Sequence, residues 1–575
     1  MGVEFFTKTL FRKKKFQGDD HLKSDFKRCL SVFDVMLISL GHMIGAGIYV
    51  LTGEVVKEQA GPGIILSFIF SAFAALLSAL SYGEFGARYP RAGSAYTYTY
   101  VTLGEIWAFI VGWTIPLEYM IGNAAVARSW SGYLDKMFDN AISNFTLQHV
   151  GHLSDGQGFF SEYPDFVAFV LLIIIAVAVS LGSKISANVN SAFVTLNVAV
   201  LAFVIVAGFY YADLDNWRGT TSDGASMFLP FGISGVLKGA SSCFFAYIGF
   251  EALATAGEEA KNPHRTIPIA TFGSLGIITV IYVLMGAALS LMVPYYNVDP
   301  KAAYAAAFQT KGATIAMYIM SVGALAGMIN NLMTGSFALP RGVYAMAHDG
   351  LIFEWFAKIN PVTRTPLNAT IVFTILNAIL ALVFDLKALI EFLSIGTLIA
   401  YSTVSACVVI MRHSAAPSAE NPNVMDNGGT LKSWVPFKDF FYDLPRGTSI
   451  KSAIAVLVVG FAIIGVVLNL AIYDSLLGIL ILIVGVSISF LAFVFILGHE
   501  QNNLELSYKV PFVPYIPCLG LFINILMMVY LHYLTWIRMA VWLRLGIYFI
   551  YGIRHSHEAR KVAIKDVNGN DSSKL

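Results

Sequence analysis

The sequence predicts an all-α polytopic membrane protein with a five-plus-five inverted-repeat core, broken helices 1 and 6, and four additional C-terminal helices. The first supporting observation is composition, because the 575 residues are 57% hydrophobic and only 13% charged. The mean hydropathy of +0.69 is far above that of soluble globular proteins. Secondly, apolar segments of about 20 residues, the length that crosses a bilayer, occur about fourteen times. Thirdly, two of these segments are interrupted at corresponding positions, four apolar segments apart.

The predicted membrane spans follow one another closely, except for longer connections near 129–164 and 412–451. The spans lie at 32–52, 63–88, 104–128, 165–182, 190–211, 233–256, 266–294, 312–337, 367–384, 388–411, 452–471, 475–498, 509–531 and 535–553.

The distribution of basic residues predicts the topology. With the N-terminus inside, about 27 of the 37 lysines and arginines fall in cytoplasmic segments and about 6 in external ones, so the positive-inside rule places both termini in the cytoplasm. Five helices per repeat is an odd number, so the second repeat is inverted relative to the first. The predicted parts are a cytoplasmic tail (1–31), helices 1–5 (32–211), helices 6–10 (212–411), a cytoplasmic loop (412–451), helices 11–14 (452–553) and a cytoplasmic tail (554–575).

Two short motifs lie outside the spans. The basic run from Arg12 to Lys15 acts either as a topogenic signal or as a contact for anionic lipid. An Asn-X-Thr sequon begins at Asn144 in the long external connection and predicts a surface glycan. The alternative for Asn144 is an unmodified side chain.

The two interrupted segments carry the strongest functional signal. The first is broken at Gly45, Ala46 and Gly47, and the second near 246–249. Lipid cannot satisfy free backbone N–H and C=O groups, so unwound backbone at mid-membrane depth lines a cavity or a ligand site. Paired breaks in two halves of a chain are typical of a secondary transporter. The alternative is that the glycines only allow close helix packing or a kink.

Helix polarity predicts what the breaks bind. The helix that resumes after Gly47 presents free N–H groups and its positive end to mid-membrane, which favours a carboxylate. The first half of segment six ends with carbonyl groups near Phe245, Ala246 and Ile248, which favour an ammonium group. An α-amino acid carries both groups on its common part. The sequence therefore predicts an amino acid site in which backbone groups bind the common part of the substrate.

Ionisable residues inside the membrane are costly and are functional candidates. Glu118 in segment three and Glu251 in segment six are the strongest. Each carboxylate either pairs with a cationic substrate side chain or titrates and couples protons; the structural alternative is an interhelical hydrogen bond. Glu84 and Arg88 are four residues apart, which predicts an intrahelical ion pair.

The motifs of several other protein classes are absent from the sequence. There is no GxxxxGK[ST] phosphate loop, which argues against an ATP-driven pump, and no HExxH, CxxC or GxSxG motif. The histidines show no metal-ligand spacing. We therefore expect no enzyme activity, no metal, no cofactor, no nucleic acid and no obligate protein partner; the expected partners are an amino acid and the lipid bilayer.

Several stretches of the chain carry a family resemblance between about Leu30 and His557. They are GAGIYVLTG (45–53), AGPG (60–63), YGEFGARYPRAGSAY (82–96), GEIWAFIVGW (104–113), VARSWSGYLD (126–135), LKGASSCFFAYIGFEALATAGEEAKNPHRTIP (237–268), PRGVYAMAHDGL (340–351), YKVPFVPYIPCLGLFINI (508–525) and YGIRHS (551–556). These stretches resemble the cationic amino acid transporter family, the fourteen-helix branch of the amino acid–polyamine–organocation superfamily.

The resemblance implies sodium-independent, potential-driven facilitated diffusion of arginine, lysine and ornithine at the plasma membrane. It also implies that Ile44 to Gly47 and Phe245 to Ile248 bind the common part of the substrate. Asn197 aligns with the coupling lysine of proton-coupled bacterial relatives, and a neutral amide there favours uniport.

Three departures from the family pattern leave the substrate range and proton sensitivity open. Glu118 stands where the best-known animal members have Ser, His42 replaces a small residue, and His348 replaces an acidic residue. The alternative function is a neutral or broad-range, proton-sensitive amino acid transporter, for which a lysosomal membrane is an alternative location. An ion channel would need polar rings or carbonyl filters, which the asymmetric breaks fit poorly.

Overall fold

The computed structural model describes residues 10–14 and 31–551, apart from short gaps within the second range. These gaps are 46, 91–92, 155–158, 181–182, 221–223, 225, 252, 254–259, 301, 362, 364, 392–394, 416–426, 436–446, 505 and 532.

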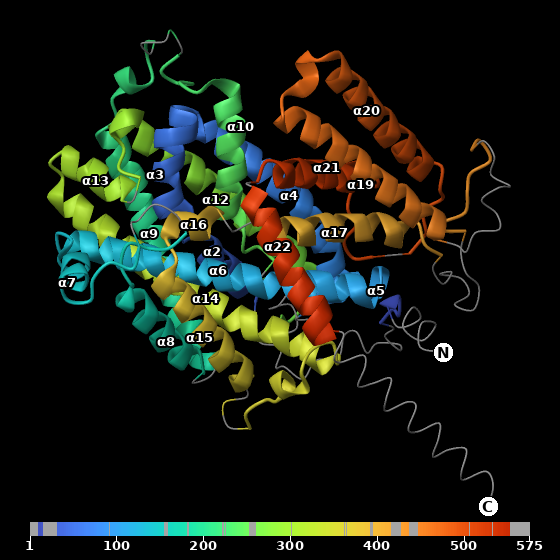
Figure 1. Cartoon of the computed structure of the whole chain (residues 1–575), viewed down its shortest axis with the longest axis horizontal. Coiled ribbons are helices and arrows are strands. Elements are labelled where there is room, and N and C mark those ends of the chain that lie inside the picture. The colour runs from blue at the N-terminus through green and yellow to red at the C-terminus, as the bar shows by residue number, and fades with distance from the viewer. Residues whose placement is uncertain are drawn as a thin grey trace, which may run out of the picture.

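The described chain folds as a bundle of α-helices, which confirms the predicted fold class, and a helix occupies each predicted span position (Figure 1). The core contains α2 (Val32–Met43), α4 (Ile64–Arg88), α6 (Glu105–Met137), α8 (Phe166–Ser180), α9 (Ser183–Tyr210), α10 (Gly232–Cys243), α12 (Pro263–Met292), α14 (Thr314–His348), α15 (Leu367–Val383) and α17 (Ile395–Arg412). The C-terminal helices are α19 (Thr448–Asn469), α20 (Leu476–Leu497), α21 (Tyr515–Val529) and α22 (Tyr533–Leu545).

Helix lengths within the described residues separate continuous spans from interrupted ones. Eight helices are long and apolar enough to cross a membrane, or nine if the pair formed by α21 and α22, bent by 105°, is one span. Three further apolar helices, α2, α8 and α15, are shorter. Helix α2 is short because the chain unwinds after Met43, and α10 ends at the second break.

The start and the end of α2 follow from local sequence. Ser31 and Asp34 form a capping box: the Asp34 N–H donates to Ser31 Oγ at 3.3 Å, and the Ser31 N–H donates to the Asp34 carboxylate at 2.8 Å. The helix ends at Ile44, whose ψ of 98° is extended. Helical structure resumes in η2 (Gly47–Leu51) and continues through α3 (Thr52–Val55) and η3 (Val56–Ala60).

A buried ion pair joins two core helices and also holds the segment that precedes α21. Glu84 near the end of α4 accepts two hydrogen bonds from Arg412 at the end of α17, at 2.9 and 3.1 Å. The Val510 N–H, in the segment that precedes α21, donates to the same carboxylate at 2.7 Å. The predicted Glu84–Arg88 pair is therefore wrong, and the Arg88 guanidinium lies over the Tyr89 ring instead. Arg412 and Val510, which belong to other segments, reach the Glu84 carboxylate at hydrogen-bond distance.

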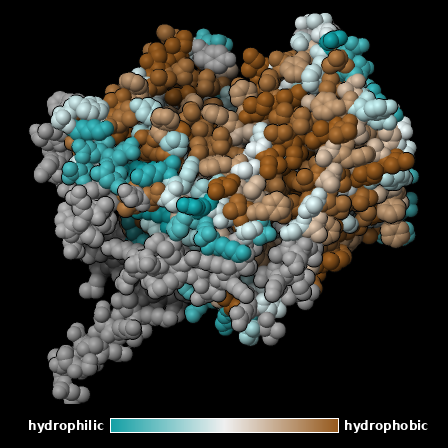
Figure 2. Space-filling model, turned by 180° about the vertical axis from the view of Figure 1, so that it is seen from behind, coloured by the Kyte–Doolittle hydropathy of each residue, from teal (hydrophilic) through white to brown (hydrophobic). Residues whose placement is uncertain are grey.

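The surface is largely apolar, as a bilayer requires. Figure 2 shows hydrophobic side chains over most of the described part of one face, with hydrophilic side chains gathered toward one side. Helix α20 illustrates this, since Leu476 is 76% exposed and Leu491 is 66% exposed. Asn144 lies exposed on α7 (Ala141–His149), at the end of the molecule opposite α5 (Ala95–Thr102) (Figure 1).

The basic N-terminal run makes specific contacts. Arg12 forms an ion pair with the buried Glu105 at 2.8 Å, and Lys14 pairs with Asp349 at 2.7 Å. Glu105 begins α6 and Asp349 follows α14. These two residues of the run therefore bind other parts of the protein, in addition to any role in topology.

Candidate functional site

The two helix breaks meet in the middle of the bundle. Gly47 lies directly against Ala246, since a Cβ at Gly47 would be only 2.7 Å from the Ala246 Cα. The Tyr282 hydroxyl of α12 lies 2.7 Å from the Met43 carbonyl oxygen and 2.9 Å from that of Ala246. One side chain therefore bridges the end of α2 and the end of the first half of segment six.

The first break depends on glycine at a crowded position. A Cβ at Gly45 would be 2.8 Å from the amide nitrogen of Asn331, which itself donates to the His42 carbonyl oxygen. The Ile48 and Tyr49 N–H groups donate to the Gly45 carbonyl oxygen at 3.2 and 3.4 Å. These long bonds begin a helix whose N-terminal end faces the break.

The second break follows a short 3₁₀ turn, η6 (Phe244–Tyr247). The Ile248 N–H donates to the Phe245 carbonyl at 3.2 Å, and the chain then passes Gly249 at φ +131°, which L side chains rarely adopt. In the part of the chain that the structure describes, the Phe245 carbonyl accepts from the Ile248 N–H, and the Ala246 carbonyl lies 2.9 Å from the Tyr282 hydroxyl. A carbonyl oxygen has two lone pairs, so each of these oxygens still has capacity for a second donor.

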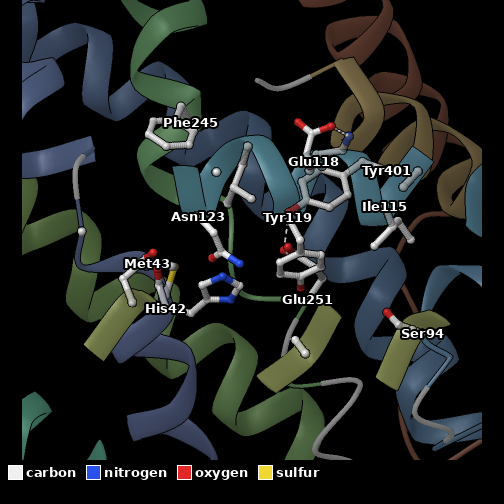
Figure 3. Close-up of a pocket in the computed structure, with 18 of the residues that line it drawn as sticks. His42, Met43, Ser94, Ile115, Glu118, Tyr119, Asn123, Phe245, Glu251 and Tyr401 are labelled. Carbon is white, nitrogen blue, oxygen red and sulfur yellow. Dashed lines mark hydrogen bonds between the residues drawn. The ribbon is translucent and has the colours of Figure 1, made fainter. Parts of the chain in front are cut away.

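A cavity of about 90 Å³ lies beside the breaks (Figure 3). Its described lining includes most of the residues predicted to bind substrate: Gly45, Gly47, Glu118, Phe245, Ala246, Ile248 and Glu251. Ile44 is buried next to the break and is outside this lining, and Ala46 lies outside the described residues. The structure therefore brings together predicted residues that are about 200 positions apart in the sequence.

The cavity extends toward the end of the molecule at which α5 lies. Ser94 and Tyr96, at the start of α5 (Ala95–Thr102), belong to its lining, and the Tyr96 hydroxyl donates to Asp349 at 2.8 Å. In the opposite direction, the buried Tyr133 donates to the backbone oxygen of Tyr49 at 2.7 Å. Packed tyrosines thus lie on the side of the cavity toward α7.

Glu251 presents its carboxylate to the cavity with one oxygen occupied. Its Oε2 accepts hydrogen bonds from the Tyr401 hydroxyl at 2.6 Å and from the Gly249 N–H at 2.9 Å. Figure 3 shows Glu251 near the centre of the lining, below Tyr401. Both of these donors reach Oε2, so Oε1 is the oxygen to which we assign contact with a ligand.

Glu118 also lines the cavity, but its carboxylate is directed at a helix. Its Oε2 accepts from the Thr397 N–H at 3.1 Å, in the first turn of α17, and a Cβ at Gly396 would be 2.3 Å from the same oxygen (Figure 3). This is the interhelical hydrogen bond expected as the structural alternative. The positive N-terminal end of α17 stabilises a carboxylate at this position.

Asn197 lies outside the cavity lining, buried behind the first break. Its amide oxygen accepts from the Tyr49 hydroxyl, and its amide nitrogen faces Gly327 of α14, where a Cβ would be 1.9 Å away. The side chain on α9 therefore contacts Tyr49 of the first segment and lies against Gly327 of α14.

Two further polar residues of the lining were not predicted to bind substrate. Asn123 is 3% exposed and its Nδ2 has no hydrogen-bond partner among the described residues; His42 is 7% exposed and the same holds for its Nδ1. The His42 ring stacks on Tyr119 with centroids 5.5 Å apart. Figure 3 shows both polar groups directed into the cavity. An asparagine in an apolar span is the signal that would have identified Asn123.

Comparisons with known proteins agree with this architecture. A model of the amino acid permease family matches residues 30–424, and a model of the C-terminus of amino acid permeases matches residues 508–556. The human cationic amino acid transporter 4 is 41% identical, with 94% of this chain and 90% of that protein covered. The chain belongs to the cationic amino acid transporter family. Membership in this family supports amino acid transport across a membrane rather than catalysis.

One further member of the cationic amino acid transporter family and one solved structure are similar to this chain. The Arabidopsis thaliana protein named cationic amino acid transporter 4, vacuolar, is 33% identical, covering 95% of this chain and 96% of its own. The crystal structure of MhsT in complex with L-phenylalanine aligns with a TM-score of 0.50 at 13% identity, covering 82% of this chain and 98% of that one. The latter likeness supports the fold alone.

Proposed function

We propose that this protein carries cationic L-amino acids, such as arginine, lysine and ornithine, across the plasma membrane by sodium-independent, potential-driven facilitated diffusion. One observation carries the proposal. Among the described residues, the lining of the cavity contains two carboxylates, Glu118 and Glu251, and no lysine or arginine. A cavity with this charge balance favours a cation over an anion.

The backbone of the breaks would hold the common part of the substrate. The N-terminal end of η2 near Gly47 faces the cavity and suits a carboxylate. The Phe245 and Ala246 carbonyls retain acceptor capacity and suit the α-ammonium group. Such contacts are the same for every L-amino acid, so specificity would come from the rest of the lining.

Glu251, His42 and Asn123 would contact the side chain of the substrate. Glu251 Oε1 supplies the negative charge, while His42 Nδ1 and Asn123 Nδ2 add polar atoms that have no hydrogen-bond partner among the described residues. A guanidinium carries five N–H donors and an ammonium carries three. Buried polar atoms that stay unpaired with an apolar substrate disfavour that substrate, because their desolvation is then uncompensated.

Asn197 supports uniport within this proposal. Its amide bonds to Tyr49 and lies against Gly327. An amide neither binds nor releases a proton near neutral pH, so this position has no group for proton coupling. Transport would then follow the electrochemical gradient of the cationic substrate alone.

A second candidate is a neutral or broad-range amino acid transporter on a lysosomal membrane. The observation that favours it is that both carboxylates already accept hydrogen bonds, Glu118 from Thr397 and Glu251 from Tyr401 and Gly249. The vacuolar name of the Arabidopsis relative adds support for an internal membrane.

Uptake of labelled arginine and leucine into cells or proteoliposomes, with and without sodium, separates the two candidates. The proposal predicts saturable arginine uptake, trans-stimulation by internal arginine, and no effect of sodium replacement. Leucine uptake equal to arginine uptake would instead support the broad-range transporter. Staining of an epitope-tagged protein on intact cells reports the location independently of the substrate.

A further inference from the structure

A large groove separates the core from the C-terminal helices. It measures about 870 Å³, within the roughly 300–1,000 Å³ of small-molecule sites. The groove lies between η3, α4 and α10 on one side and α19 and α21 on the other (Figure 1). Its apolar lining is formed by Phe70, Phe73, Ala74, Phe231, Leu237, Ala240, Leu468, Ile523, Leu526, Met527 and Tyr530.

The groove opens to the hydrocarbon side of the protein. Phe70 is 49% exposed, Leu237 is 52% exposed and Tyr530 is 46% exposed, although all three are large apolar or aromatic residues. In a membrane such side chains contact lipid tails. The occupant of the groove therefore has at least one long apolar part.

Interhelical hydrogen bonds fix one wall of the groove. Ser71 of α4 donates to the Ala240 carbonyl oxygen of α10 at 2.7 Å, and Ser242 of α10 donates to the Gln59 side chain at 2.9 Å. These bonds hold α10, α4 and η3 together at the site. The wall is thus a fixed surface and not a gap between independent helices.

Two opposite charges share this apolar groove without neutralising each other. Lys238 on α10 and Glu58 on η3 both belong to the lining and both are exposed. Neither forms an ion pair within the described part of the chain. Glu58 follows the predicted span 32–52 and Lys238 lies near the start of the predicted span 233–256, so we expect both charges near the membrane boundary, where lipid head groups lie. The partner that suits both is a zwitterion.

We propose that the groove binds one glycerophospholipid with a primary ammonium in its head group, a phosphatidylethanolamine. The phosphate pairs with the Lys238 ammonium, the head-group ammonium pairs with the Glu58 carboxylate, and the acyl chains follow the aromatic and aliphatic lining. The side chains of Ser234 and Ser241 lie in the same lining and offer hydrogen bonds to the head group or ester oxygens.

The site has a consequence for the transport core. Helix α10 supplies both Lys238 and the chain that leads into the second break at Phe245. A lipid held between α10 and α21 therefore contacts a helix that ends at the candidate substrate site. The lipid site itself does not depend on which amino acid the protein carries.

Lipid retention by the purified full-length protein tests the site. Wild type, Lys238→Met and Glu58→Gln are equilibrated in detergent with equal amounts of dioleoyl-phosphatidylethanolamine, -phosphatidylcholine and -phosphatidylglycerol, and bound lipid is measured by mass spectrometry. Wild type should retain phosphatidylethanolamine in preference to the other two. Lys238→Met should lower that retention by about two- to fivefold, the range of a partly exposed charge pair.

Glu58→Gln tests the second half of the proposal separately. It should keep the total bound phospholipid and lose the preference for phosphatidylethanolamine over phosphatidylcholine, with phosphatidylglycerol retention rising because the repulsive carboxylate is gone. Lys57→Gln is the matched control, since Lys57 adjoins Glu58 in sequence and is not part of the groove lining. Its retention should match wild type.

Equal retention of the three phospholipids by wild type would overturn the proposal, and so would equal losses of bound lipid for Lys238→Met and Lys57→Gln. Displacement of the bound phospholipid by an added sterol would overturn it as well. A dimer whose contact requires Lys238 would likewise assign the groove to a second copy of the chain. Thermal unfolding of each variant without added lipid shows whether any loss reflects misfolding.

Discussion

Replacing Glu251 by glutamine removes one negative charge from the cavity while keeping the shape of the side chain. The glutamine carbonyl oxygen can still accept from the Tyr401 hydroxyl and the Gly249 N–H, which lie 2.6 and 2.9 Å from Oε2 of the native residue. The substitution therefore acts mainly on the oxygen that faces the cavity. A substrate that carries a cationic side chain loses its charged partner, and a neutral substrate does not.

The expected size of the effect follows from the place of the partly buried Glu251 carboxylate in the cavity lining. Losing one partner of a hydrogen-bonded buried charge pair costs about 2–5 kcal/mol. At about 1.4 kcal/mol for each factor of ten, Glu251→Gln should weaken arginine and lysine by about 30-fold or more. Leucine should change by less than about fivefold, the effect of about 1 kcal/mol.

Glu118→Gln is the comparison, because the Glu118 carboxylate accepts from the Thr397 N–H of α17. A glutamine oxygen can keep that bond, and the substitution removes the charge interaction with the helix end, worth about 0.3–1 kcal/mol. Its effect should be similar for arginine and leucine. Competition of unlabelled arginine, lysine and leucine against labelled substrate measures all values in one assay. Equal weakening of arginine and leucine by Glu251→Gln would refute the assignment of Glu251 to the substrate side chain.

Three further predictions concern coupling and stability. Wild-type uptake should change little between pH 5.5 and 7.5 at fixed potential, whereas Asn197→Lys should block transport or make it acid-stimulated; pH-dependent wild-type uptake at clamped voltage would contradict this. Arg412→Met should leave Glu84 buried without its partner and lower the free energy of unfolding by about 3–5 kcal/mol. Adding Glu84→Gln to this variant should restore part of the loss, which thermal unfolding measures. Burial lowers the pKa of His413 to about 4, below its unfolded value of about 6.5. The stability contributed by the neutral side chain is therefore complete above pH 6.5 and is lost as the pH falls toward 4, by roughly 3 kcal/mol at most. The melting temperature of a His413→Gln variant should depend less on pH between pH 5 and 7.5, and an unchanged dependence would exclude this role.

The helix breaks were predictable because their cause is local. Glycines in the middle of apolar spans mark positions where backbone approaches backbone, and Gly45 and Gly47 meet Asn331 and Ala246 at distances that exclude a Cβ. Glu251 was a candidate from the sequence because an acid inside a span is costly, and the structure places its side chain in the cavity lining.

The partners of these residues were not predictable from one sequence. Tyr282 bridges the two breaks, yet a tyrosine in an apolar helix carries no distinctive signal. The Glu118 carboxylate meets Thr397, 279 positions away. Glu84 shows the opposite failure, because the four-residue spacing to Arg88 suggested a local pair and the fold supplied Arg412 instead. Long-range packing decides such pairings, and spacing along the chain does not encode it.

The most direct test of the central proposal is the current carried by arginine in voltage-clamped cells that express the protein at the surface, with intracellular pH recorded. A cationic uniporter should give a saturable inward arginine current without sodium. The potential is worth about 2.3 kcal/mol per charge at 100 mV, or roughly 50-fold accumulation. Intracellular pH should stay constant. Arginine uptake that is indifferent to voltage, or accompanied by acidification in proportion to amino acid entry, would contradict potential-driven uniport.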